Sequence, residues 1–242
     1  MFAAGATLLL VIVRLLLQTY SIFGMDEGIT VNGVRIVALE TQWGTGWWWQ
    51  FGGALAAVLL TAVAFSSVAP LLLGAAALAV AATLPLTGHA VAEPGPTLSV
   101  LTQVVHVVGG GLWLGTLSLL FVFMFVGRKD HAPQHALWIQ SFSPLALSGA
   151  ALLMISGVVT TVRYVDFPTA LWTTPYGGVL TAKIILVGLV VACGVYNWRR
   201  VRPQLTDPDS EADLRRWVTR ELGFALLVLA VTAALVALPK EE

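Results

Sequence analysis

The sequence contains an apolar stretch of about 30 residues, from Thr97 to Gly127. As a helix, this stretch would extend roughly 45 Å, which exceeds the roughly 30 Å of hydrocarbon in a bilayer. It is therefore predicted to cross a membrane. Its one ionisable side chain, His106, lies well inside the stretch. Because polar groups are expensive at that depth, His106 is a candidate functional residue.

The composition indicates an integral membrane protein of the all-α class. Hydrophobic residues make up 57% of the 242 positions and charged residues only 11%. Long apolar runs favour helices over the alternating segments of a membrane barrel. Thirteen basic and thirteen acidic residues cancel, so no net field would attract nucleic acid. A single cysteine, Cys193, excludes an internal disulfide, and no phosphate-binding loop indicates nucleotide hydrolysis.

The pattern of apolar runs predicts a polytopic bundle of about seven transmembrane helices. We interpret the first run as a span rather than a signal peptide, because it lacks a basic start and a small-residue cleavage site. We expect the whole chain, 1–242, to form a single transmembrane domain embedded in the lipid bilayer. The predicted spans are 2–23, 45–65, 67–87, 97–126, 144–163, 176–197 and 214–238.

Local motifs predict where several helices begin. Ser143-Pro144 and Thr174-Pro175 each place a capping side chain before a proline at the first helical position. Ser210, followed by Asp213, resembles a capping box for the last helix. A tight turn near residues 66–67 is expected between the second and third spans.

The basic residues predict the orientation of the bundle. Seven of them fall on the side that the N-terminus shares: Arg128, Lys129, Arg199, Arg200, Arg202, Arg215 and Arg216. The opposite side has Arg35 and Lys240, with Arg163 at a helix end. Since basic loops stay in the cytoplasm, we expect a cytoplasmic N-terminus and a periplasmic C-terminus.

One helical stripe of the central span combines polar, small and aromatic residues. Gln103, His106, Gly110 and Trp113 fall on this stripe, which we expect to face protein rather than lipid. His106 would lie roughly 14 Å below the outer end of its helix, and Met154 at a similar depth in the next span.

His89, which follows the third span, would complete a set of two imidazoles and a thioether. Such a set suits Cu(I) or Cu(II), and imidazole alone also suits haem iron or zinc. Each of these residues also has a structural explanation. His106 could be a buried histidine bonded to a neighbouring helix, His89 could lie at the membrane interface, and Met154 could pack in the core.

Three charged residues lie inside predicted spans. Arg14 and Lys183 each cost roughly 2.5–3.5 kcal/mol at a helix centre. Glu221, in the last span, could pair with Arg14 and tie the first and last spans together, or take part in transport. Lys183 could extend to the outer interface, bind an anion or haem propionate, or gate a cation path.

The ordered motifs resemble the copper resistance D (CopD) family of bacterial inner-membrane proteins. The resemblance covers about residues 40–239 and is carried by Glu40-Thr41-Gln42-Trp43-Gly44, Thr87-Gly88-His89-Ala90, His106 with Leu112-Trp113-Leu114-Gly115, Ser141-Phe142-Ser143-Pro144-Leu145-Ala146 with Ser156-Gly157, Tyr176-Gly177, Leu180, Lys183, Asn197-Trp198-Arg199, Pro203 and Glu221.

The resemblance implies a non-enzymatic protein that moves copper from periplasm to cytoplasm, with His89 and His106 as the matching histidines. The chain lacks a methionine-rich outer segment and begins almost at its first span, although the family commonly has an additional N-terminal one. These departures favour delivery by a separate periplasmic copper protein.

Two alternatives remain open. A haem b-binding redox protein is one, because a related family in porphyrin oxidation has similarly placed histidine and lysine residues. A scaffold that docks a partner through residues 24–44 is the other. The sequence does not determine the oligomeric state.

Overall fold

The computed structural model describes residues 2–27, 29–62, 68–88, 96–126, 132–164, 169–201 and 210–237. Within these ranges the chain is helical and has no strand, which confirms the all-α class. The chain divides into two compact units, Met1–Val108 and Gly109–Glu242, each described below by itself. That the whole chain forms one transmembrane domain stays a prediction.

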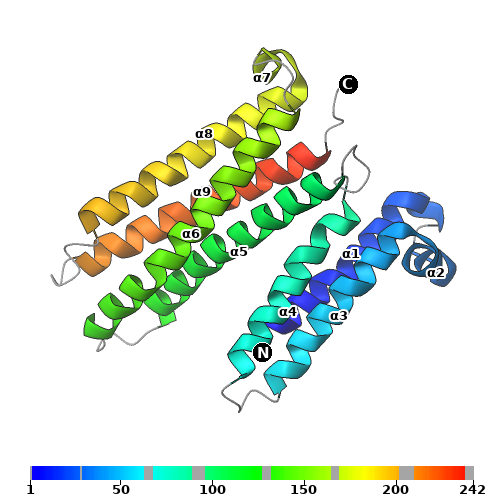
Figure 1. Ribbon diagram of the computed structural model, residues 1–242, viewed down its shortest axis with the longest axis horizontal. Coiled ribbons are helices and arrows are strands. Elements are labelled where there is room, and N and C mark those ends of the chain that lie inside the picture. Colours follow the sequence, from blue (N-terminus) through cyan, green and yellow to red (C-terminus); the bar gives the residue numbers. More distant parts are fainter. Residues whose placement is uncertain are drawn as a thin grey trace. The chain divides into compact units, whose positions relative to one another are not determined.

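In the first unit, α3 packs against both α1 and α4, and α2 packs against α1 and α3 (Figure 1). Gly24 has a φ of +76°, a left-handed conformation that glycine adopts without steric cost, and it interrupts α1 near its end. The elements are α1 (Phe2–Glu27), α2 (Val31–Glu40), α3 (Gln42–Ala62), α4 (Ala69–Thr83) and the 3₁₀ turn η1 (Leu84–Thr87).

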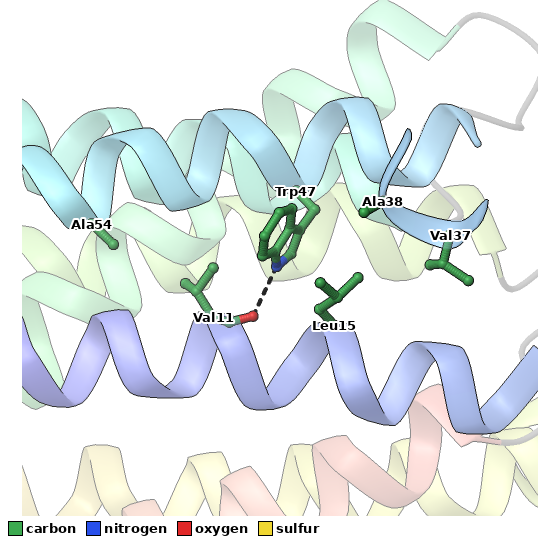
Figure 2. Close-up of a cluster of buried hydrophobic side chains, with 6 residues drawn as sticks. All are labelled: Val11, Leu15, Val37, Ala38, Trp47 and Ala54. Carbon is green, nitrogen blue, oxygen red and sulfur yellow. Dashed lines mark hydrogen bonds between the residues drawn. The ribbon is translucent and has the colours of Figure 1, made fainter. Parts of the chain in front are cut away.

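The core of the first unit is centred on Trp47. Its indole Nε1 donates a hydrogen bond of 2.8 Å to the backbone oxygen of Val11, so α3 is fixed to α1 (Figure 2). The other buried members of this cluster are Leu15, Val37, Ala38 and Ala54. At the corner between α2 and α3, a Cβ on Gly44 would lie 2.3 Å from the oxygen of Val37, so this position needs glycine.

In the second unit, α8 and α9 lie side by side (Figure 1), and Leu117 and Met124 of α5 form a core with Val218 of α9. A Cβ on Gly109 would lie 2.9 Å from the oxygen of Gly149, so glycines bring α5 and α6 into close contact. The elements are α5 (Pro96–Val126), which starts in the first unit, α6 (Ala132–Tyr164), α7 (Ala170–Thr173), α8 (Pro175–Tyr196), the π-helical turn η4 (Asn197–Val201) and α9 (Ser210–Ala237).

Within the described residues, five helices are long and apolar enough to cross a membrane: Phe2–Gly24, Thr97–Phe125, Pro144–Arg163, Pro175–Arg199 and Arg215–Val236. They match five of the predicted spans. The spans predicted at 45–65 and 67–87 correspond to α3 and to α4 with η1. Two glutamines and four tryptophans lower the hydropathy of α3, and Leu71–Thr87 is shorter than the five. The count of seven therefore stays a prediction.

The two helix starts predicted from a capping residue before a proline can be compared with the structure. Thr174 caps α8 as expected, because its Oγ1 accepts a hydrogen bond of 2.9 Å from the Gly177 amide. The start at Ser143-Pro144 is wrong: α6 begins at Ala132 and contains Pro144. Membrane helices tolerate an internal proline where neighbouring groups satisfy the freed carbonyl.

The last helix begins at Ser210, where the sequence placed its capping box. The side chain of Ser210 and the turn expected at 66–67 lie outside the described residues. Two helices occur between the predicted spans: α2 lies between the first and second, and α7 between the fifth and sixth.

Candidate functional site

The predicted stripe on α5 faces more than one environment. His106 and Trp113 are half-buried, whereas Gln103 is exposed. A Cβ on Gly110 would lie 3.7 Å from Cδ2 of Leu153, so this part of the stripe faces α6. The expectation that the whole stripe faces protein therefore does not hold for Gln103.

A buried carboxyl lies where α5, α8 and α9 meet. Glu221 of α9 is only 8% exposed, and its side chain is hydrogen-bonded to those of Trp113 and Asn197. A Cβ on Gly194 of α8 would lie 3.8 Å from Oε1 of Glu221, so the glycine keeps this face of α8 open to the carboxyl. These residues form what we call the Glu221 cluster: Trp113, Gly194, Asn197 and Glu221.

The end of α8 gives Asn197 an unusual backbone environment. Its N–H contacts the oxygens of both Cys193 and Gly194, and the chain continues as the π-helical turn η4. Such turns are frequent at functional sites. The Asn197 Oδ1 atom is buried and has no hydrogen-bond partner among the described residues. Among the described residues, the Glu221 cluster thus contains one hydrogen-bond acceptor without a donor, the Oδ1 atom of Asn197.

Arg14 forms a separate polar cluster in the first unit. Its guanidinium donates to Gln50 Oε1 at 2.7 Å and to Thr87 Oγ1 at 2.6 Å. The amide of Gln50 in turn donates to the Thr83 oxygen and to Thr87 Oγ1, both at 3.1 Å. Arg14 also lies 5.6 Å from the centre of the Trp43 ring. The half-buried guanidinium of Arg14 is therefore held by neutral acceptors from α3 and η1.

Arg14 and Glu221 each have neutral partners within their own unit, and their expected pairing with each other stays a prediction. The sequence did not predict a role for Gln50, Thr87 or Asn197. A glutamine among the apolar residues of α3 and the Asn197-Trp198-Arg199 motif were the available signals.

Lys183 lies on α8 and is half-buried. It precedes Gly194 by eleven residues, or about 16 Å of helix rise, so it is remote from Glu221. Lys183 is not part of the Glu221 cluster, and its role stays a prediction.

The predicted copper ligands are only partly described. His89 lies outside the described residues, and Met154 of α6 is 45% exposed. Among the described residues, no three His, Cys, Asp or Glu side chains group closely enough to hold a metal ion. The set of His89, His106 and Met154 therefore stays a prediction.

The five apolar helices define a multi-pass helical membrane protein. Residues 1–100 match the family model described as Copper resistance protein D-like, N-terminal domain, and residues 136–235 match Copper resistance protein D. Together these models cover most of the sequence. The chain belongs to the copper resistance protein D family, as its motifs suggested.

The chain is also similar to the copper transport protein CutJ of Bacillus subtilis (strain 168), with 25% identity over 158 residues. The match covers 64% of this chain and 28% of that protein, so it spans less than a third of the relative's length. No solved structure matches the chain. The family and the relative are both named for copper, and neither comparison supports the haem alternative.

Proposed function

We propose that this protein transports copper ions across the bacterial inner membrane, from periplasm to cytoplasm, without catalysing a reaction. The observation that carries the proposal is the pair of family matches, which together span most of a chain with five membrane-capable helices. The relative named as a copper transport protein supports the same function. The orientation with a cytoplasmic N-terminus and a periplasmic C-terminus, and a count of seven spans, belong to this proposal.

His89 and His106 are the proposed copper ligands, with Met154 as a third. Imidazole and thioether groups bind copper, and an incomplete ligand shell allows an ion to be released again. His106 is half-buried on α5, which suits a ligand inside the bilayer. Met154 is 45% exposed, so packing within its unit does not enclose its thioether. A periplasmic copper protein would deliver the ion.

The function is tested by copper uptake into liposomes that contain the purified full chain. We expect uptake above that of empty liposomes, about one equivalent of bound copper, and loss of both in His106→Ala. The matched control is His131→Ala, because His131 lies in the segment between α5 and α6, remote in sequence from the stripe. Full binding and uptake by His106→Ala would exclude this ligand assignment.

The same preparation separates copper from haem. A protein purified from haem-replete cells should show no Soret band in its visible spectrum if copper is the substrate. A Soret band that His106→Ala removes would instead favour a haem protein. Co-purification with a partner and no metal binding by the wild type would favour a scaffold.

A further inference from the structure

The residues of the Glu221 cluster are suited to binding a proton. A carboxyl inside a membrane helix is costly unless a charge or hydrogen bonds compensate it. The two partners that the structure gives to Glu221 are both neutral, namely an indole and an amide. A carboxyl in such surroundings can lower the cost by accepting a proton.

Among the side chains that the structure describes, the titratable and charged neighbours of Glu221 do not supply a compensating cation within the cluster. On α8 the titratable neighbour is Cys193, whose thiol is neutral or anionic. On α9 it is Arg220, which is exposed and lies 5.0 Å from the centre of the Trp217 ring. From α5 the cluster receives Trp113, which does not titrate.

The hydrogen-bonding groups can serve both protonation states of Glu221. Trp113 Nε1–H only donates, so it requires a carboxyl oxygen without a proton. An asparagine amide can donate through Nδ2 or accept through Oδ1, and rotation about its last side-chain bond exchanges the two. Donation from Asn197 suits the ionised carboxylate, whereas the buried, unpaired Oδ1 is an acceptor for the O–H of the protonated acid.

We infer that the Glu221 cluster is a proton-binding site, in which Trp113 holds one carboxyl oxygen and Asn197 adapts to the presence of the proton. The route to water is short. The apolar span of α9 begins at Arg215, six residues or about 9 Å from Glu221, and Arg215 and Arg220 are exposed. If the proposed copper transport holds, binding and release of this proton couple copper movement to a proton gradient.

Proton binding is tested without copper, using the full chain in phosphatidylethanolamine and phosphatidylglycerol liposomes. Infrared difference spectra across a pH titration should show the carbonyl band of a protonated carboxyl. Glu221→Gln should remove this band, while Glu40→Gln, on the exposed face of α2, should retain it. Identical spectra for Glu221→Gln and the wild type would overturn the inference.

A second measurement does not depend on the folding of Glu221→Gln. The indole N–H band in ultraviolet resonance Raman spectra of the wild type should change over the same pH range as the carboxyl band. Trp113→Phe should remove this change, and Trp172→Phe, at an exposed tryptophan, should retain it. A wild-type indole band that is insensitive to pH would contradict the assigned hydrogen bond.

Coupling is tested by copper uptake with and without an imposed pH gradient. We expect a several-fold response in the wild type and none in Glu221→Gln. Uptake that ignores the gradient would exclude coupling and leave copper transport standing. A titrating carboxyl band without any copper uptake would retain the proton site and overturn the proposed function.

Discussion

Gly149 of α6 lies so close to Trp113 of α5 that a Cβ on the glycine would be 2.6 Å from the backbone nitrogen of the tryptophan. The same Cβ would lie 2.8 Å from the oxygen of Gly109. Both atoms belong to helix backbone and cannot move aside independently. The position of Trp113, and with it one hydrogen bond of Glu221, therefore depends on a glycine in the neighbouring helix.

Gly149→Ala should separate α5 from α6 and destabilise the second unit by about 1–3 kcal/mol, as expected for overpacking. Thermal unfolding in detergent, followed by tryptophan fluorescence, measures the effect. The matched control is Gly188→Ala on α8, where a Cβ would meet nothing within 4 Å. Equal unfolding temperatures for the two variants would contradict the close contact.

Gln50→Leu should leave the Arg14 guanidinium without its 2.7 Å acceptor. A hydrogen bond to a charged group contributes roughly 1.5–3 kcal/mol, so we expect a loss of stability of that order. Gln42→Leu changes an exposed glutamine of the same helix and should have little effect. If denaturant unfolding gives the same stability for both variants, Gln50 does not support Arg14.

Thr174→Ala should loosen the first turn of α8, because its hydroxyl accepts the Gly177 amide at 2.9 Å. Loss of such a cap costs about 1 kcal/mol, and Thr174→Ser should restore it. Hydrogen exchange at the Gly177 amide reports the change directly. Thr173→Ala serves as a control, since the Thr173 hydroxyl donates to the Thr169 oxygen and not to the Gly177 amide. Equally fast exchange of the Gly177 amide in Thr173→Ala would argue against a specific cap.

The proposed orientation predicts which side of the membrane two arginines face. In a Cys193→Ser background, Arg35→Cys should react with a membrane-impermeant maleimide in intact spheroplasts. Arg199→Cys should react only after the membrane is opened. Both positions are exposed, so burial within the protein does not block the reagent. The reverse labelling pattern would place the N-terminus in the periplasm.

The apolar helices could be predicted because hydropathy over about 20 residues reflects the thickness of the bilayer. Local motifs were less dependable. Thr174-Pro175 starts α8, whereas the similar Ser143-Pro144 lies inside α6. The difference comes from the residues before each proline. The helix of α6 already extends back to Ala132, so its proline falls in the interior.

The partners of the charged residues could not be predicted from spacing. Pairing Arg14 with Glu221 assumed that opposite charges meet inside a membrane. The structure satisfies each with neutral groups, Gln50 and Thr87 for the arginine and Trp113 and Asn197 for the glutamate. Such partners come from other helices and carry no charge, so only the packing of the helices identifies them.

The hydrogen bond from Trp47 to the Val11 oxygen also determines how α1 is rotated about its own axis. Lipid accepts any apolar side chain, so it does not determine how a helix rich in leucine and valine is rotated about its own axis. A directional bond from the indole to one carbonyl removes that freedom. Arg14 lies less than one turn further along α1 than Val11. By fixing the rotation of α1, Trp47 therefore helps to point the Arg14 guanidinium towards Gln50.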